Sequence, residues 1–498
     1  MLRIPIYILL FVSLLTGQSL WLPFDEIEHR SVQTLGVCYP DARIRLSEAP
    51  WSDSTVMRLL PLIRQADISP FLMYRLNALK PFIRFHKQHA RGMLYFRGRA
   101  HWLNGFENRE SLRFEPDLMF GLKIDKSLSA YFDFQVDTDG HQDSDYHGVR
   151  EWKDITGDFR SAAILYQKPR WSLLAGRLPV HWGPGHTGSL LTSGFAPALD
   201  MIKLDLYGGP FRFQAFNARL LRNGSLLNGS GPEENVNRYF SGHRFSLRNS
   251  RFELGLHETV IYGGGDEPAN PAYLNPLIPY YFSDVMQVER KGDNITLAAD
   301  AALFRPRGFR WYAQVAVDEY YYEREDYPRR AAFLAGADWC GQSQGLPLFV
   351  NLEYARMDRW IYNYDARYPW SRLDYFNSVL GHPLGPDSEM LRSLVEWTPW
   401  SVLNTRFLLS FTRQGETTAT TPFFNSELAG KTSQPFPSGT VTSVLQFRTI
   451  VTWRFRPSWR IELALDTLEI QNARHLSGTD ETDTRVRMTV FWDGVTVW

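Results

Sequence analysis

The chain has 498 residues, with 54 Lys and Arg against 54 Asp and Glu, so its formal net charge is zero. This balance gives no bulk electrostatic attraction to nucleic acid or to an anionic surface. Aromatic residues make up 14% of the sequence, and beyond the first residues no apolar run reaches the roughly 20 residues that a transmembrane helix requires.

Residues 1–19 have the pattern of a secretory signal peptide. Arg3 supplies positive charge, residues 4–15 are apolar, and Gly17-Gln18-Ser19 offers small residues at the cleavage spacing. A membrane anchor is the alternative, but an apolar run of about 12 residues is too short to span a bilayer. We therefore expect cleavage near Ser19 and export of the chain.

Residues 20–88 show helical rather than strand periodicity. Apolar residues recur at helical spacing within 54–87, and Ser69-Pro70 divides this stretch into two pieces. Pro61 is expected to kink or shorten the first piece. We predict a small periplasmic helical module at 20–88, ahead of the rest of the fold.

From residue 89 onward the side chains alternate with a period of two. In Ser458–Glu469 one face is apolar and aromatic, and the other carries Arg460, Glu462 and Asp466. Such alternation predicts a strand with one apolar and one wet face. An aromatic outer face and a charged inner face are the pattern of a transmembrane β-barrel.

Short turns and long loops alternate strictly along 89–498. Eight short turns and nine long loops predict an all-β transmembrane barrel of about 18 antiparallel strands, with both termini on the periplasmic side. Tyr281–Glu289 is left out as a strand because it would break this parity. The terminal Trp498 is typical of barrels delivered to the outer-membrane assembly machinery. The short turns are 125–127, 168–170, 208–210, 248–250, 305–308, 341–345, 399–401 and 456–458.

The sequence does not settle the chemistry of two features, the pair of cysteines and an acidic loop. Cys38 and Cys340 are free to form a disulfide in an oxidising compartment, and neither has the spacing of a metal site. The loop 137–145 carries Asp137, Asp139, Asp143 and Asp145, but it lacks the helix-loop pattern of a Ca²⁺ site, which favours a solvated acidic loop.

The segment between predicted strands five and six is dense in glycine and proline, which impose specific turns and permit close backbone approach. A phosphate cradle is disfavoured because no Lys-Ser/Thr follows. Loop 181–198 is then either a loop folded inward and packed inside the barrel or a constriction loop that contacts sugar. The sequence of this segment is Gly176-Arg177-Leu178-Pro179-Val180-His181-Trp182-Gly183-Pro184-Gly185.

This run, with Leu190-Leu191 and Asp200, resembles the signature region of the capsule assembly protein Wzi family. A second block, Glu258–Gly263 followed by Asn275-Pro276, is similar as well. The resemblance implies an outer-membrane lectin that holds capsular or other exported polysaccharide at the cell surface, with no catalytic residues and no cofactor. Besides the polysaccharide, we expect outer-membrane lipid and the barrel assembly machinery as partners, and a monomeric chain.

Loop 358–388 is the candidate glycan-binding loop. Aromatic rings cover the apolar faces of sugars, while charged side chains bind hydroxyls or uronic carboxylates. Loops 263–293 and 320–330 are similar in character. The alternative is that these aromatics form the interfacial girdle and pack the loops together. The candidate contacts are Trp360, Tyr362, Tyr364, Arg367, Tyr368, Trp370, Arg372, Asp374 and Tyr375.

The sequence gives weaker support to two other function classes, an enzyme and a channel. Gly341-Gln342-Ser343-Gln344-Gly345 matches the nucleophile motif of hydrolases, but it falls in a predicted turn without the strand-to-helix elbow, so we expect no enzyme. A porin or saccharide channel is the alternative function. The inward charges are of both signs and the Gly/Pro loop is placed to plug the pore, which favours an occluded barrel.

Overall fold

The computed structural model describes residues 20–24, 26–63, 69–88, 90–106, 109–138, 149–152, 155–220, 236–264, 267–285, 292–318, 330–376, 378–422 and 434–498. The predicted signal peptide 1–19, Asp139, Asp143 and Asp145 of the acidic loop, and residues 320–329 of one aromatic loop lie outside the described residues.

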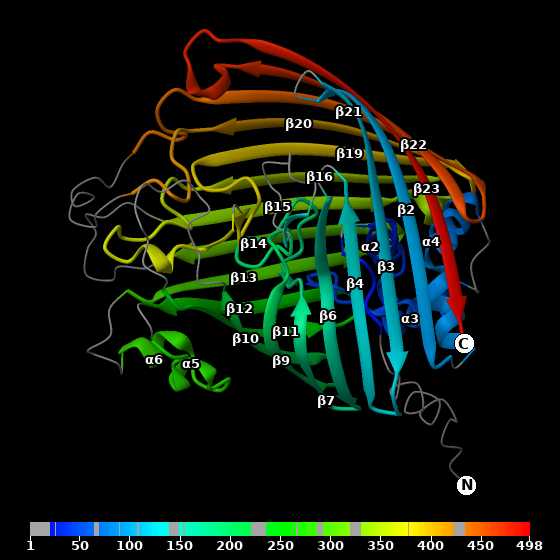
Figure 1. Cartoon of the computed structure of the whole chain (residues 1–498), viewed down its shortest axis with the longest axis horizontal. Helices are drawn as coiled ribbons and strands as arrows, with labels where there is room; N and C mark the ends of the chain where they lie inside the picture. The colour runs from blue at the N-terminus through cyan, green and yellow to red at the C-terminus, as the bar shows by residue number, and fades with distance from the viewer. Residues whose placement is uncertain are drawn as a thin grey trace.

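Within this part of the chain, eighteen antiparallel strands close into one barrel, which confirms the predicted fold class (Figure 1). Each strand pairs with its sequence neighbours, and β2 closes the ring against β23 from Met93↔Val497 to Asn104↔Val486. A closed ring leaves no unpaired edge. A further short strand, β5 (Val149–Trp152), pairs with β6 only.

The strands follow the predicted turns closely. The connection between β2 and β3 is shorter than the predicted loop 103–111, because both strands extend into that loop. The barrel strands are β2 (Gly92–Phe106), β3 (Arg109–Lys123), β4 (Leu128–Asp137), β6 (Ile155–Lys168), β7 (Trp171–Leu178), β9 (Leu199–Gly208), β10 (Phe211–Leu220), β11 (Arg238–Arg248), β12 (Phe252–Gly263), β13 (Asn294–Arg305), β14 (Phe309–Asp318), β15 (Ala331–Cys340), β16 (Leu348–Met357), β19 (Ser388–Trp400), β20 (Leu403–Gln414), β21 (Thr442–Arg456), β22 (Trp459–Gln471) and β23 (Glu481–Val497).

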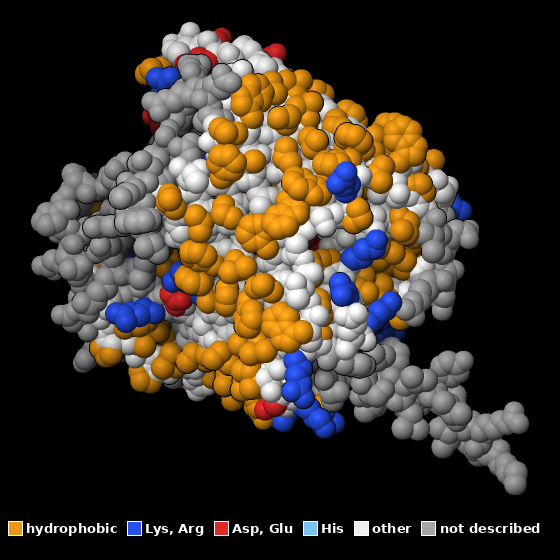
Figure 2. Space-filling model, turned by 45° about the vertical axis from the view of Figure 1, so that its right-hand side comes forward, with side chains coloured by type: hydrophobic (Ala, Val, Ile, Leu, Met, Phe, Trp, Pro, Cys, Tyr) orange, Lys and Arg blue, Asp and Glu red, His pale blue; other side chains and the backbone are white. Residues whose placement is uncertain are grey.

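The outer wall is apolar, as the alternation predicts. Leu256, Ile202 and Trp311 expose 63%, 59% and 56% of their surface on three different strands. Figure 2 shows apolar side chains over much of the visible wall. The inward positions between them are charged or polar, such as the buried Arg460 and Asp466 of β22. The apolar outer face suits contact with the lipid hydrocarbon, and the polar inner face suits contacts inside the lumen.

Three helices, α2 (Ile27–Cys38), α3 (Asp53–Ile63) and α4 (Pro70–Lys87), form from the segment predicted to be helical. α4 begins as the sequence indicates, with Pro70 in its first turn and the Ser69 side chain accepting a hydrogen bond from the Leu72 amide at 3.2 Å. Pro61 remains inside α3. None of the helices in the described part of the chain has the length and apolar character needed to cross a bilayer.

These helices lie at the short-turn end of the barrel and inside it, rather than ahead of it as expected (Figure 1). The Arg248 guanidinium donates to the Ile44 carbonyl at 2.9 Å, and the Ser69 hydroxyl donates to Gln342 in a short turn at 2.6 Å. Sequence periodicity shows a helix but not its neighbours, which is why the position of this segment differs from the expectation. Its location on the periplasmic side stays a prediction.

A disulfide joins the N-terminal helical segment to the barrel wall. The sequence alone leaves open whether the two cysteines pair, and the structure shows that they do. Cys38 ends α2 and Cys340 ends β15, and their Cα atoms are 5.5 Å apart. The bond closes a sequence separation of 302 residues.

Two short helices, α5 (Pro271–Leu274) and α6 (Tyr280–Val285), occupy part of the loop between β12 and β13. Their Tyr273 and Tyr280 pack with Val260 and Tyr262 of β12. Residues 280–285 are helical, which agrees with leaving the described part of Tyr281–Glu289 out of the strand count; residues 286–289 lie outside the described residues.

Candidate functional site

The lumen is filled first by the N-terminal segment, which we call the plug (the described residues of 20–88). Glu48, in the two-residue strand β1 (Glu48–Ala49), forms ion pairs with Arg212 at 2.6 Å and Arg244 at 3.5 Å. Burial alone raises the pKa of Glu48, but the surrounding guanidinium groups outweigh burial and lower it below its ordinary value. The buried carboxylate of Glu48 thus holds the plug to arginines of the wall.

A second set of ion pairs holds the start of α2. Arg97 of β2 pairs with Glu26 at 3.2 Å and Glu28 at 2.5 Å, and Arg99 pairs with Glu26 at 3.0 Å. Burial raises the pKa of Glu26, but the arginines around it lower it far more, so this carboxylate stays charged. Inward-facing charges such as these would suit a channel lining. In this barrel they form ion pairs with the plug instead.

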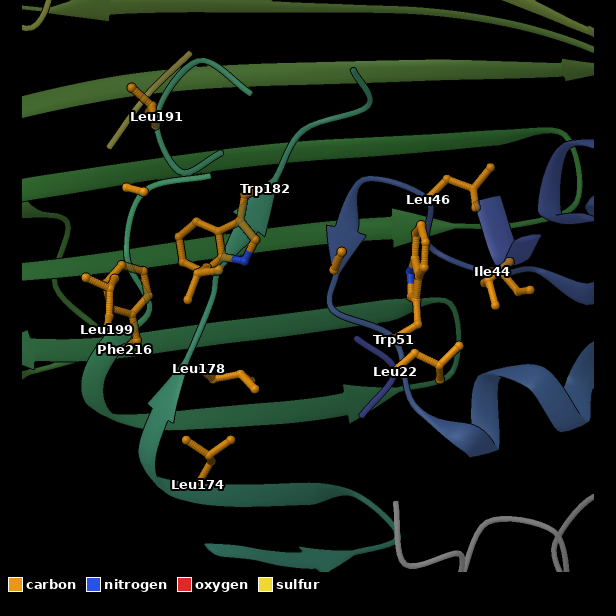
Figure 3. Close-up of a cluster of buried hydrophobic side chains, with 14 of the residues drawn as sticks. Leu22, Ile44, Leu46, Trp51, Leu174, Leu178, Trp182, Leu191, Leu199 and Phe216 are labelled. Carbon is orange, nitrogen blue, oxygen red and sulfur yellow. The ribbon is translucent and has the colours of Figure 1, made fainter. Parts of the chain in front are cut away.

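Loop 181–198 lies on top of the plug, inside the barrel. Its strand β8 (His181–Trp182) pairs with β1 of the plug. The amides of His186 and Thr187 donate to the Glu353 carboxylate of β16 at 2.7 and 2.9 Å. In Figure 3, Trp182 points toward Phe216, and their ring centroids are 5.1 Å apart. Of the two interpretations of this loop, the structure shows the inward-packed one.

The glycines and prolines of this segment have packing roles. A Cβ on Gly183 would lie 2.6 Å from Gln314 Oε1, and a Cβ on Gly185 would lie 2.4 Å from the Gly188 carbonyl. Gly176 has φ +137°, where its Cβ would meet the Ala162 carbonyl at 2.3 Å. The loop therefore requires glycine for close approach. Among the remaining motif residues, Arg177 pairs with Asp200 at 2.6 Å, Pro179 leads into β8, and the Pro184 carbonyl accepts a hydrogen bond from Arg310.

Loop 358–388 covers the opposite, long-loop end, and we call it the lid. Arg238 of β11 donates to the carbonyls of Trp370 and Arg372 at 2.8 and 2.9 Å, and to the Asp374 carboxylate at 2.8 Å. From below, the Tyr362 hydroxyl donates to the Leu190 carbonyl of the inward loop at 2.9 Å. Plug, inward loop and lid are thus three layers in contact.

The lid is also tied to its neighbouring loop. Asn363 donates to the Thr418 carbonyl at 2.8 Å, and the Trp360 indole donates to Gln434 at 2.9 Å. At the end of the lid, the Asp387 carboxylate accepts from the Thr417 and Ser438 amides at 3.2 and 3.0 Å. These contacts cross-link two long loops into one surface.

The nine candidate glycan contacts divide by exposure. Arg367 is exposed, and Tyr368, Trp370 and Arg372 are half-buried. Tyr368 and Trp370 form an edge-to-face pair with centroids 5.7 Å apart, and the Arg367 guanidinium lies 5.6 Å from the Tyr368 ring. The five that the lid buries, and that therefore act as its internal packing, are Trp360, Tyr362, Tyr364, Asp374 and Tyr375.

Several residues that hold the lid gave no sequence signal. Arg238 begins a strand beyond a long polar loop, and Asn294 donates to the Ser371 carbonyl at 2.9 Å from the start of β13. Only the three-dimensional arrangement brings these strand ends to the lid. Among the described residues, no group of three or more His, Cys, Asp or Glu is placed to hold a metal ion. The Gly341–Gly345 motif forms the turn after β15, beginning in a 3-10 helix (Gly341–Gln344), as predicted.

His382 joins the lid to the inward loop. The Leu384 amide donates to its Nδ1 at 3.4 Å, so its Nε2 donates to the Thr187 hydroxyl at 3.0 Å. Burial lowers the pKa of His382 to about 4. Burial also lowers the pKa values of His29 and His181.

We expect acid to destabilise the fold partly through His382. Between pH 6.5 and 4 the unfolded chain binds a proton that the folded chain does not, so the free energy of unfolding falls as pH drops. For His382 this loss is about 2 kcal/mol at pH 5. Urea unfolding followed by Trp fluorescence at pH 7.5 and pH 5 should show a smaller drop in His382→Gln than in the unaltered protein. An equal drop in both would mean that other groups cause the acid sensitivity.

Comparison with known proteins identifies a family that has this architecture. The family model "Capsule assembly protein Wzi" matches residues 104–485. The solved structure of Wzi from Escherichia coli, described as an outer membrane protein involved in group 1 capsule assembly and a carbohydrate-binding β-barrel, superposes with a TM-score of 0.61 at 13% identity, covering 95% of this chain and 99% of that chain.

Other barrels are less similar. OccD3 (OpdP) of Pseudomonas aeruginosa has a TM-score of 0.44 at 11% identity over 81% of this chain and 90% of that chain. OccAB4 of Acinetobacter baumannii has a TM-score of 0.45 at 9% identity over 82% and 98%. No curated protein matches the sequence. The family match spans well over half of the chain. The chain therefore belongs to the capsule assembly protein Wzi family.

Proposed function

We propose that this protein binds exported polysaccharide on the lid side of its barrel and retains it at the cell surface, without cleaving or transporting it. A closed antiparallel barrel with an apolar exterior is an outer-membrane architecture, and the protein is an outer-membrane protein. In such barrels the short turns face the periplasm, so the lid faces outward.

The observation that carries this proposal is the three-layer closure of the lumen. Plug, inward loop and lid contact one another through Trp182, Leu190 and Tyr362. The predicted alternative, a porin or saccharide channel, needs a continuous wet path through these layers. A barrel whose lumen holds these three layers, and whose lid exposes an arginine beside two aromatic rings, is suited to holding a ligand rather than passing it.

The strip consists of Arg367, Tyr368 and Trp370. Its half-exposed rings are available to the apolar faces of sugar rings. The exposed Arg367 guanidinium donates to the Asp365 carboxylate through Nε and Nη2 at 2.8 and 2.9 Å, and its remaining N–H groups are offered to sugar hydroxyls. The carbohydrate binding described for Wzi of Escherichia coli supports this assignment. The buried aromatic residues of the lid hold the strip in place.

Replacing the strip tests the proposal. Arg367→Ala with Tyr368→Ala should weaken binding of the cells' own surface polysaccharide about tenfold, because a ring contact and a charge-assisted hydrogen bond are lost. The measurement is polysaccharide retained on intact cells, with barrel folding checked by heat-modifiable migration in gels. Tyr281→Ala, which removes a 53% exposed ring from α6 on the loop between β12 and β13, is the matched control. Equal retention by all three proteins would rule out the strip as the binding surface.

A further inference from the structure

A cleft of about 750 Å³ lies at the short-turn end of the barrel, between α4 and the turn that joins β21 to β22. On the helix side, Lys80, Arg84 and Lys87 follow one another at spacings of four and three residues, which puts them on one face of α4. On the barrel side, the cleft is lined by Arg454 and Arg456. Five cationic residues from two separate parts of the chain therefore meet in one space.

The acids that line the same cleft are already paired within the barrel. Glu28 forms an ion pair with Arg97 at 2.5 Å, and Asp493 pairs with Arg97 at 2.9 Å and Arg460 at 2.7 Å. Within the described ranges, none of the five cationic side chains forms an ion pair. The cleft therefore has an excess of positive charge.

Two residues that line the cleft each have a buried polar atom without a hydrogen-bond partner. These are Nε of Arg454 and Oδ1 of Asn77. Arg454 makes only a long contact with this helix, from its guanidinium to the Asn77 carbonyl at 3.4 Å. Of the two, only the Arg454 nitrogen is a donor and suits an anionic acceptor, whereas Oδ1 of Asn77 is itself an acceptor.

Helix stabilisation does not account for this cluster. Cations in the last turn of a helix interact favourably with its C-terminus, which explains Arg84 and Lys87. Lys80 lies outside that turn, and like charges four residues apart disfavour a helix. The two arginines of the barrel wall are not part of the helix at all. Repulsion among these groups is relieved when an anion occupies the cleft.

The cleft borders the level of the membrane headgroups. Outside the same turn, Trp453, Phe455, Trp459 and Trp492 form a chain of exposed rings, with successive centroids 5.6, 6.4 and 6.4 Å apart. Exposed aromatic residues of this kind mark the membrane interface. Phe455 of this chain of rings itself lines the cleft, together with the turn residues Pro457-Ser458. An anion that reaches the cleft over this turn can come from a lipid.

We propose that the cleft binds the phosphate headgroup of an anionic phospholipid from the leaflet that the short turns face. This inference depends on the membrane orientation given under the proposed function, and not on glycan binding. Lys and Arg side chains from α4 and from the wall surround the phosphate, while the acyl chains stay against the ring chain outside. Lipid bound there would join the plug to the barrel rim.

Native mass spectrometry of the full-length protein in neutral detergent tests this site. The probes are phosphatidylglycerol, phosphatidylcholine and inorganic phosphate. We expect retention of phosphatidylglycerol in preference to phosphatidylcholine, and a loss of affinity of tenfold or more in Lys80→Gln/Arg84→Gln/Lys87→Gln, because the variant removes three of the five cations that attract the lipid phosphate. All three residues are exposed, so the variant is expected to fold.

The matched control, Lys126→Gln/Arg170→Gln/Arg251→Gln, removes three exposed cations from other short turns at the same end of the barrel. It should keep the affinity of the unaltered protein. Equal loss in both variants would show general surface attraction and overturn the site. Displacement of the lipid by millimolar inorganic phosphate would assign the cleft to free phosphate instead. Polysaccharide retention, measured separately, should be unchanged in the cleft variant, which separates this proposal from the proposed function.

Discussion

Replacing Glu48 with glutamine is expected to loosen the plug and to open an ion-conducting path through the barrel. The substitution leaves Arg212 and Arg244 with Asp205 and Asp300 as their remaining acidic partners. Removing one partner from a buried charge network costs roughly 3 kcal/mol. We expect planar-bilayer recordings of Glu48→Gln to show steady openings, whereas the unaltered protein remains silent.

Glu481→Gln is the control for this prediction. Glu481 forms an ion pair with Arg474 at 3.5 Å, but both side chains reach solvent, with 43% and 81% of their surface exposed, so its loss should change neither stability nor conductance. If Glu48→Gln is as silent and as stable as the control, the ion pairs of β1 do not hold the plug in place.

Removal of the disulfide is the second large effect we expect. Cys38→Ser with Cys340→Ser should lower the free energy of unfolding by about 2–5 kcal/mol, because the bond closes a very long loop of the unfolded chain. Urea unfolding followed by Trp fluorescence measures this loss, and limited proteolysis should cut the plug of the variant first.

A reducing agent supplies the internal check on the disulfide. It should shift the unfolding midpoint of the unaltered protein toward that of the double variant and leave the variant itself unchanged. Identical midpoints for both proteins under oxidising conditions would mean that packing and ion pairs alone fix the plug.

The barrel could be predicted from the sequence because its determinants are local. The alternation of side chains shows the two faces of a strand, as in Trp459–Gln471. Seven of the eight short turns contain glycine, proline or asparagine, and the eighth, 125–127, begins with Asp125. Strand order in a meander follows chain order, so no long-range information is needed. The same holds for the start of α4, where Ser69-Pro70 is a local capping signal.

The sequence suggested the inward loop 181–198, but the entry of the N-terminal segment into the lumen could not be predicted, because it depends on contacts between distant parts of the chain. Glu253 accepts from the amides of Leu46 and Ser47 at 3.0 and 3.1 Å, across more than 200 residues. Cys38 and Cys340 meet only because the plug enters the barrel. A single sequence shows neither contact.

The candidate glycan site shows the same limit at the level of single residues. Tyr362 and Tyr368 have the same side chain within one loop, yet the first is buried against Leu190 and the second is half-exposed. Composition identifies an aromatic loop, but only its packing separates the rings that support the lid from those that face outward.

Direct binding of polysaccharide by the purified protein tests the central claim. Proteoliposomes carrying the full-length barrel would be sedimented with polysaccharide extracted from the surface of the same cells, and both bound amount and chain length would be measured. Saturable binding with unchanged chain length is the result expected of a non-catalytic surface lectin. Absence of binding at any polysaccharide concentration, or recovery of shortened chains, would contradict it.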